Sequence, residues 1–143
     1  EDVFAEVIKR EISGLKGAML EAVEREKDPG KKLKVFVDTR LRYLTQKEDQ
    51  YILVKDEYLR HYGFIRNLTA DYSDWEIETI KGIVEEGRDR GLFSVTAPAA
   101  VARAVFFALK GLEYPWATNM TRDETRKSVN ILVDILLKGI SKN

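Results

Sequence analysis

The segment from Ala97 to Leu112 has only two charged residues, Arg103 and Lys110, although its apolar residues recur with the spacing of an α-helix. The two charges lie seven residues apart, so they fall on one narrow line along that helix. A surface helix of a globular domain normally has a polar face covering about half of its circumference. This helix therefore has to be buried on nearly every side. In a chain of 143 residues, a second copy of the chain is the expected source of the missing cover.

The last apolar segment, which follows Thr121, has the same imbalance. Its polar line consists of Lys127, Asn130, Asp134, Lys138 and Ser141. Small residues on the preceding helix would let another helix approach to roughly 8 Å. We therefore expect two copies to form a two-fold, four-helix interface. The residues expected in it are Ala100, Ala104, Ala108, Gly111, Val129, Leu132, Val133, Leu136 and Ile140. The alternative is a hairpin that is fully buried inside one domain.

Composition places the chain among helix-rich globular domains, with 44% apolar and 34% charged residues. The 24 basic residues are balanced by 24 acidic ones, so this chain lacks the basic excess that a DNA-binding surface needs. It contains no cysteine, which excludes disulfides and thiolate chemistry. The uncharged run 92–102 is much shorter than the roughly 18–20 residues that cross a bilayer. We expect a cytoplasmic protein without a membrane partner.

The apolar period is helical along the whole chain, which predicts one all-α domain, residues 1–143, built as a six-helix bundle. The expected helices span about 2–27, 29–46, 48–62, 73–90, 97–114 and 121–140. Asp28 and Pro29 predict the start of the second helix. Capping boxes are expected at Ser73–Glu76 and Thr121–Glu124. The residues 63–72 between the third and fourth helices are expected to form a loop.

The junction Glu86-Gly87-Arg88-Asp89-Arg90-Gly91-Leu92-Phe93 resembles the Gly-x-x-x-Gly-x-Phe junction common in TetR-type transcriptional regulators. The alanine-rich helix ending Lys110-Gly111-Leu112 and the final helix ending Leu137-Lys138-Gly139-Ile140 are similar to the same family. The opening Glu1 to Ile8 resembles the segment that follows its helix-turn-helix, and the chain starts without Met, as a fragment would. The resemblance covers the whole chain as helix order and length.

The resemblance implies a dimeric repressor whose N-terminal DNA-binding helices are missing from this chain. Residues 1–27 would be the helix that links to them. The domain present here would bind a small molecule and dimerise through its last two helices. Operator DNA would be contacted only through the missing helices, and ligand binding would shift the two DNA-binding domains apart.

Aromatic residues gather in the middle helices, where tyrosines could combine an apolar wall with an orienting hydroxyl. The residues expected to line a pocket are Phe36, Tyr43, Tyr58, Tyr62, Trp75, Phe106 and Phe107. As a group they favour an apolar or aromatic small-molecule effector. The alternative for each of them is an ordinary place in the core.

No catalytic site, metal site or cofactor is expected. His61 is the only histidine and lies four residues after Glu57, which favours a surface ion pair or the edge of a pocket over a metal site. Arg103 and Lys110 are either the solvated line of a buried helix or charges that meet a ligand carboxylate. Two other functions stay open. One is a helical adaptor that binds a partner helix in a groove, and the other is an all-helical carboxylate enzyme with inward-facing acids around a metal.

Overall fold

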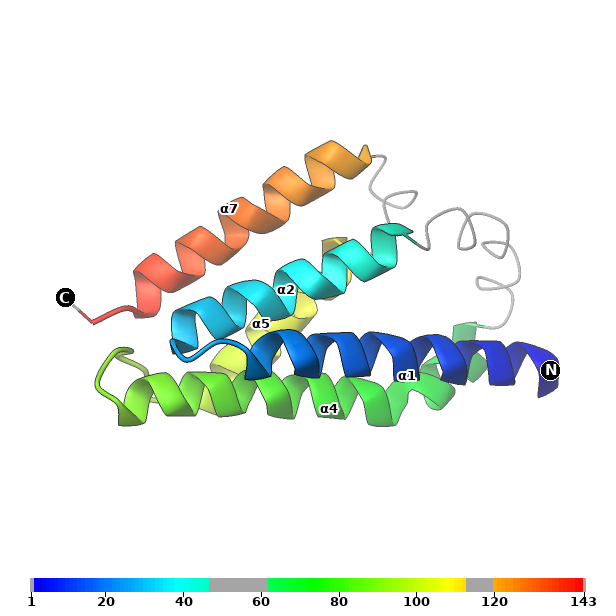
Figure 1. Cartoon of the computed structure of the whole chain (residues 1–143), viewed down its shortest axis with the longest axis horizontal. Coiled ribbons are helices and arrows are strands. Elements are labelled where there is room, and N and C mark those ends of the chain that lie inside the picture. The colour runs from blue at the N-terminus through cyan, green and yellow to red at the C-terminus, as the bar shows by residue number, and fades with distance from the viewer. Residues whose placement is uncertain (1, 47–61, 113–119, 143) are drawn as a thin grey trace.

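A computed structural model describes residues 2–46, 62–112 and 120–142, and these residues form five α-helices and no strand beyond one isolated bridge (Figure 1). The helices, labelled as in Figure 1, are α1 (Asp2–Glu24), α2 (Pro29–Gln46), α4 (Tyr62–Asp89), α5 (Pro98–Leu112) and α7 (Arg122–Ile140). The all-α prediction is confirmed. Of the third helix expected over residues 48–62, only Tyr62 lies within the described residues.

Helix α2 is the central element of the bundle. It runs antiparallel to α1 and packs on α1, α4 and α7 (Figure 1). Helix α4 runs beside α1 in the same direction, α5 returns behind them, and α7 closes the bundle against α2 and α5. No helix among the described residues is long and apolar enough to cross a membrane.

The turn between α1 and α2 follows the expected chemistry, although α1 ends at Glu24, three residues earlier than predicted. Asp28 accepts a hydrogen bond from the Lys31 backbone N–H through Oδ2 (3.0 Å), as an N-cap does. Pro29 occupies the first helical position and is buried.

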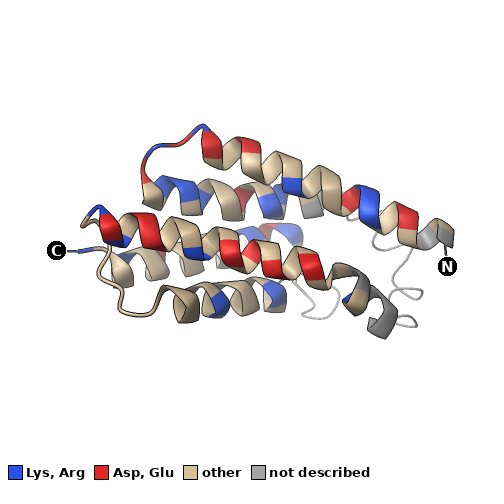
Figure 2. Cartoon of the chain, turned by 90° about the horizontal axis from the view of Figure 1, so that it is seen from below, with Lys and Arg blue, Asp and Glu red and all other residues tan. Residues whose placement is uncertain are grey.

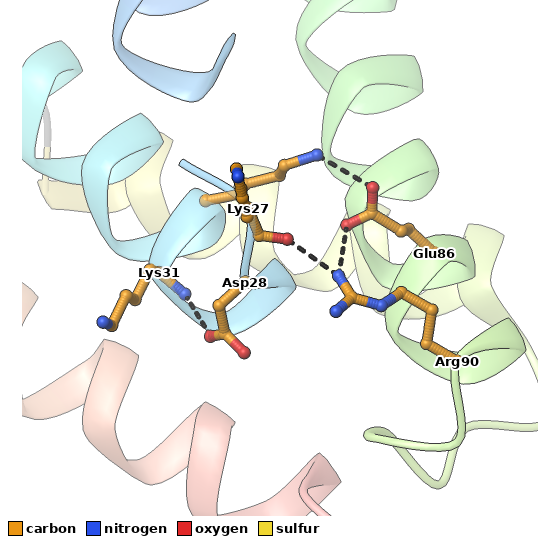
Figure 3. A network of polar contacts seen from close by, with 6 residues as sticks. Lys27, Asp28, Lys31, Glu86 and Arg90 are labelled. Atoms are coloured by element: carbon orange, nitrogen blue, oxygen red, sulfur yellow. Dashed lines mark hydrogen bonds and ion pairs between the residues drawn. The ribbon is translucent and has the colours of Figure 1, made fainter. Parts of the chain in front are cut away.

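A polar network fastens this turn to the end of α4 (Figure 3). Arg90 donates from Nη1 to the Lys27 carbonyl oxygen (2.7 Å), and Lys32 Nζ lies 2.8 Å from Glu86 Oε1. The second oxygen of Glu86 lies 3.8 Å from Arg90 Nη1. The first turn of α2 and the last turns of α4 are therefore held side by side by charge as well as by packing.

The prediction of a loop over residues 63–72 is wrong, because these residues belong to α4. The capping box at Ser73–Glu76 is also wrong, since Ser73 lies in the helix interior. The composition of this segment, which begins with Gly63, suggested a loop. Gly63 is instead the second residue of α4, where it does not interrupt the helix. Tertiary contacts then override local propensity, because Trp75 and Glu76 both point into the bundle.

One apolar core joins all five helices. Its fully buried side chains come from every helix and meet between α2 and α4, with Met19, Leu33, Phe36, Ile80 and Val84 almost inaccessible to solvent. Helix α5 adds Ala102, Val105, Phe106 and Leu109, and α7 adds Val129 and Val133. On α2 and α4, the side chains that meet here recur at helical spacing along one face of each helix.

The α4–α5 junction shows why its glycines are needed. Gly91 has a φ of +73°, which glycine adopts without the steric cost that other residues incur. A Cβ atom on Gly87 would lie 2.0 Å from Cδ2 of Phe93, so the Phe93 ring occupies the place of that side chain. The backbone N–H groups of Leu92 and Phe93 donate to the Gly87 carbonyl oxygen at 2.8 and 3.0 Å.

The end of α7 is pinned to the same junction. Ser94 N–H donates to the Ile140 carbonyl oxygen (2.7 Å), and Lys142 N–H donates to that of Leu92 (2.9 Å). At the other end of α7, the Thr121 hydroxyl accepts a hydrogen bond from the Glu124 backbone N–H (3.1 Å), which confirms the Thr121 half of the predicted capping box. The start of α7 is thus fixed by a local cap, and its end is fixed by hydrogen bonds to the α4–α5 junction.

Candidate functional site

The structure places two of the expected ligand residues ring to ring between α2 and α4. The Phe36 and Trp75 ring centroids are 6.4 Å apart, and Tyr72 stacks on Trp75 at 5.7 Å. The Tyr72 hydroxyl donates to Met19 Sδ (3.6 Å), and Lys16 Nζ lies 5.0 Å from the Trp75 ring centroid. This aromatic cluster extends from the buried Phe36 to the half-buried Tyr72 at the α1–α4 groove.

Tyr43 is half-buried on α2 and faces α1 rather than the aromatic cluster. Its hydroxyl donates to Glu11 Oε2 (3.4 Å) and reaches so close to Gly14 that a Cβ atom there would lie 2.4 Å away. Burial raises the pKa of Tyr43 above its ordinary value of 10.0, and the Glu11 carboxylate raises this pKa further. A neutral phenol is therefore held between the two helices.

The remaining expected ligand residues lie apart from this cluster or outside the described residues. Phe106 is buried, whereas its neighbour Phe107 is 63% exposed, with the two ring centroids 5.5 Å apart. Tyr58 lies outside the described residues, as does the side chain of Tyr62, the first residue of α4. His61 is likewise outside them.

A buried ion pair crosses from α2 to α4, and the sequence analysis missed it. Arg40 Nε lies 2.5 Å from Glu76 Oε1, and the side chains are 5% and 1% exposed. The second oxygen of Glu76 is buried and accepts no hydrogen bond from the described residues. The signal was present: Arg40 follows Phe36 by one turn on the apolar stripe of α2, and Glu76 precedes Ile80 by one turn on that of α4.

The expected dimer residues divide into an outer and an inner set. Ala100, Ala104 and Gly111 are exposed on α5, and Ala108, Leu132 and Leu136 are half-buried. Val129, Val133 and Ile140 lie instead in the protomer's own core. Three large apolar side chains that were not predicted as dimer residues are exposed on these helices. They are Phe107, Ile131 and Ile135, which are 63%, 60% and 64% exposed.

We call the outward-facing apolar residues of these two helices the α5–α7 face. It consists of Ala100, Ala104, Phe107, Ala108 and Gly111 on α5 and of Ile131, Leu132, Ile135 and Leu136 on α7. Figure 2 shows charge spread along α1 and α4, whereas α5 is coloured as uncharged apart from Arg103 and Lys110. Arg103 is exposed at the edge of the face, and Lys110 lies with Nζ 5.7 Å from the Phe106 ring centroid.

A hollow of about 130 Å³ opens on this face between α5 and α7. It is lined by Val37, Ala104, Val105, Ala108, Leu109, Leu132, Val133 and Leu136. Two other hollows have charged walls. One of about 420 Å³ lies between α2 and α7 beside Lys34, Asp38 and Asp134, and one of about 300 Å³ lies between α1 and α4 beside Lys9 and Lys16.

Among the described residues, no group of three or more His, Asp or Glu side chains is arranged to hold a metal ion. The described residues offer three kinds of chemical group. These are a neutral phenol, a buried carboxylate–guanidinium pair beside aromatic rings, and an apolar surface with a hollow in it.

Comparison with known proteins defines the fold and goes no further. No family model and no curated protein matches the sequence. The structure is similar to that of a protein of unknown function from Rhodococcus sp. RHA1, with a TM-score of 0.70 and 15% sequence identity. The similarity covers 96% of this chain and 71% of that one. At this identity, the match shows that this arrangement of helices also occurs in a solved protein.

Proposed function

We propose that the chain is the ligand-sensing and dimerisation domain of a TetR-type transcriptional repressor. In this proposal two copies associate through α5 and α7, and each copy binds a small apolar or aromatic effector among its middle helices. Effector binding controls DNA binding by a helix-turn-helix that would precede α1. The domain itself has a recognition role and no catalytic one.

The observation that carries the proposal is the α5–α7 face. Large apolar side chains that are exposed together often mark sites of association. Phe107, Ile131 and Ile135 are all at least 60% exposed, and the small residues Ala100, Ala104 and Gly111 of α5 are exposed as well. A second copy of the same face would cover these side chains and leave the charged surfaces of α1 and α4 in solvent.

The sensing role is supported by the polar and aromatic groups between α2 and α4. Ligand pockets are mostly apolar and carry a few well-placed polar groups. Phe36 and Trp75 provide the apolar surface, and the Glu76 carboxylate next to them has a buried oxygen without a described donor. An effector with a hydrogen-bond donor on an aromatic body matches this chemistry.

Helix α1 would connect the sensing site to the proposed DNA-binding helices. It packs on both α2 and α4: Tyr43 of α2 donates a hydrogen bond to Glu11 of α1, and Tyr72 of α4 donates one to Met19 of α1. Its first turns expose Val3 and Val7, which are 80% and 49% accessible. A change in the spacing of α2 and α4 would be transmitted to this end of the chain, where a preceding domain would attach.

Light scattering after size exclusion tests the proposal. At micromolar concentration we expect a mass of twice 16.4 kDa, and native mass spectrometry of the same sample should detect a small molecule that co-purifies with the dimer. A monomer would contradict the dimerisation role. A dimer that binds no member of a panel of apolar and aromatic compounds, as followed by Trp fluorescence, would contradict the sensing role.

A second candidate function is a helical adaptor that binds a partner helix. The open hollow between α5 and α7 favours it, because amphipathic helices bind in apolar grooves of this kind. An adaptor would be monomeric when its partner is absent. The same light-scattering measurement therefore separates the two functions.

A further inference from the structure

The α5–α7 face carries both a projecting aromatic side chain and an apolar hollow. We infer that, in the dimer, Phe107 of each protomer inserts its ring into the hollow between α5 and α7 of the partner. This inference rests on the proposed dimer and names the contact that holds it together. It predicts an isologous interface in which the same insertion occurs twice.

Phe107 is an aromatic side chain that projects into solvent. Its neighbour Phe106 is buried in the protomer core, whereas Phe107 is 63% exposed although it has the same side chain. The Phe106 ring contacts only one edge of it, with centroids 5.5 Å apart in a T-shaped arrangement. A solvated phenyl ring on an apolar face gains most from an apolar site that excludes water, and aromatic anchors of this kind dominate binding at interfaces.

The hollow has the size and lining for that ring. Its volume is about 130 Å³ and its walls are aliphatic. A dry cavity of roughly 150 Å³ with such walls binds benzene, so a phenyl group fits a slightly smaller hollow that is open on one side. Ala104 and Ala108, one turn apart, form the α5 wall, and their small size leaves the space open.

The positions of the Phe107 ring and the hollow along α5 determine how the two protomers would be arranged. Phe107 is three residues after Ala104, which lines the hollow, so the two side chains are neighbours on the helix surface and lie within one turn. A two-fold axis that exchanges them must pass close to this turn. The two copies of α5 then cross at their alanines, where small residues permit a close approach, and Ile131 and Ile135 cover the flanks.

Two variants test the insertion separately. Phe107→Ala removes the ring and keeps the hollow, whereas Ala108→Leu keeps the ring and fills the hollow. Each change should raise the dissociation constant of the homodimer by about tenfold or more, measured by analytical ultracentrifugation. Val7→Ala, which alters an exposed apolar residue on α1, should leave this constant unchanged. Circular dichroism melts at low concentration verify that each variant folds.

Mixing the two variants gives the decisive readout. A mixed dimer has one intact insertion, from Phe107 of the filled chain into the open hollow of the other, while both homodimers have none. Native mass spectrometry of co-expressed F107A and A108L should therefore find more heterodimer than the half that random pairing gives. Random pairing, or an F107A dimer as tight as the unaltered one, would overturn the inference and leave the proposed dimer intact. A monomeric unaltered chain would overturn both.

Discussion

At the scale of single residues, the buried Arg40–Glu76 pair is the group whose removal has the clearest physical consequence. Its side chains are 5% and 1% exposed, so solvent does not screen the charges. Removing one member of a buried pair costs roughly 3–5 kcal/mol, because the other charge loses its counter-charge in a medium of low polarity. Replacing both members with apolar residues avoids that cost.

We therefore expect Glu76→Leu to lower the free energy of unfolding by roughly 3–5 kcal/mol, and the double variant with Arg40→Met to recover part of the loss. Urea titration followed by circular dichroism measures both changes. The control is Asp38→Ala, which breaks the pair with Arg42 on the same helix and should cost at most about 1 kcal/mol because both side chains are largely exposed. Equal losses for Glu76→Leu and Asp38→Ala would contradict this account.

This pair was not predicted from the sequence, and helical periodicity alone does not identify partners on separate helices. Two charges on apolar faces of separate helices become a pair only when the helices pack at one register. That register is set by contacts such as that of Phe36 with Trp75, which involve residues 39 positions apart in the sequence. The same limit applies to the aromatic residues. The sequence predicted that they gather among the middle helices, but the position of Phe107 outside the cluster depends on which side of α5 faces the core.

At the scale of elements, the junction between α4 and α5 was predicted well because its signals are local. Gly91 ends α4 in the left-handed conformation, and Gly87 leaves room for the Phe93 ring. The loop predicted over residues 63–72 was wrong for the opposite reason. There the local signals indicated a turn, but packing of Tyr72 and Trp75 against α1 and α2 made one continuous helix of residues 62–89.

Glycine-to-alanine changes in α4 and just after its end test the roles assigned to the junction glycines. Gly87→Ala should destabilise the protein by about 1–3 kcal/mol, because the new methyl group overlaps the Phe93 ring. Gly91→Ala should cost about 1–2 kcal/mol through its positive φ. Gly82→Ala is the matched control, since nothing lies within 4 Å of its added Cβ, and it should stabilise the helix by about 0.5–1 kcal/mol. Thermal melts of the three variants rank them, and a Gly87→Ala protein as stable as Gly82→Ala would refute the assigned role of Phe93.

At the scale of the whole molecule, the main feature is the set of exposed apolar side chains on α5 and α7, which includes Phe107, Ile131 and Ile135. The sequence predicted that α5 and α7 need cover, and it identified Ala100, Ala104 and Gly111, which are exposed. It did not predict which side of α7 faces outward. Val129 and Val133 pack into the protomer core, and Ile131 and Ile135 take the outer positions, because α2 and α5 fix the rotation of α7 about its axis.

Association through the α5–α7 face makes stability depend on protein concentration, because only folded chains can dimerise. For a dimer of two 143-residue chains, the melting temperature should rise by about 2 °C for each tenfold increase in concentration. Differential scanning calorimetry at concentrations from about 5 to about 500 micromolar measures this rise, because these concentrations lie above and around the dissociation constants of micromolar dimers. Phe107→Ala should weaken the rise at the dilute end, while Val7→Ala should follow the unaltered chain. A melting temperature that is constant over this range would mean that the exposed side chains of α5 and α7 are not covered by a second copy, and it would favour a partner of another kind.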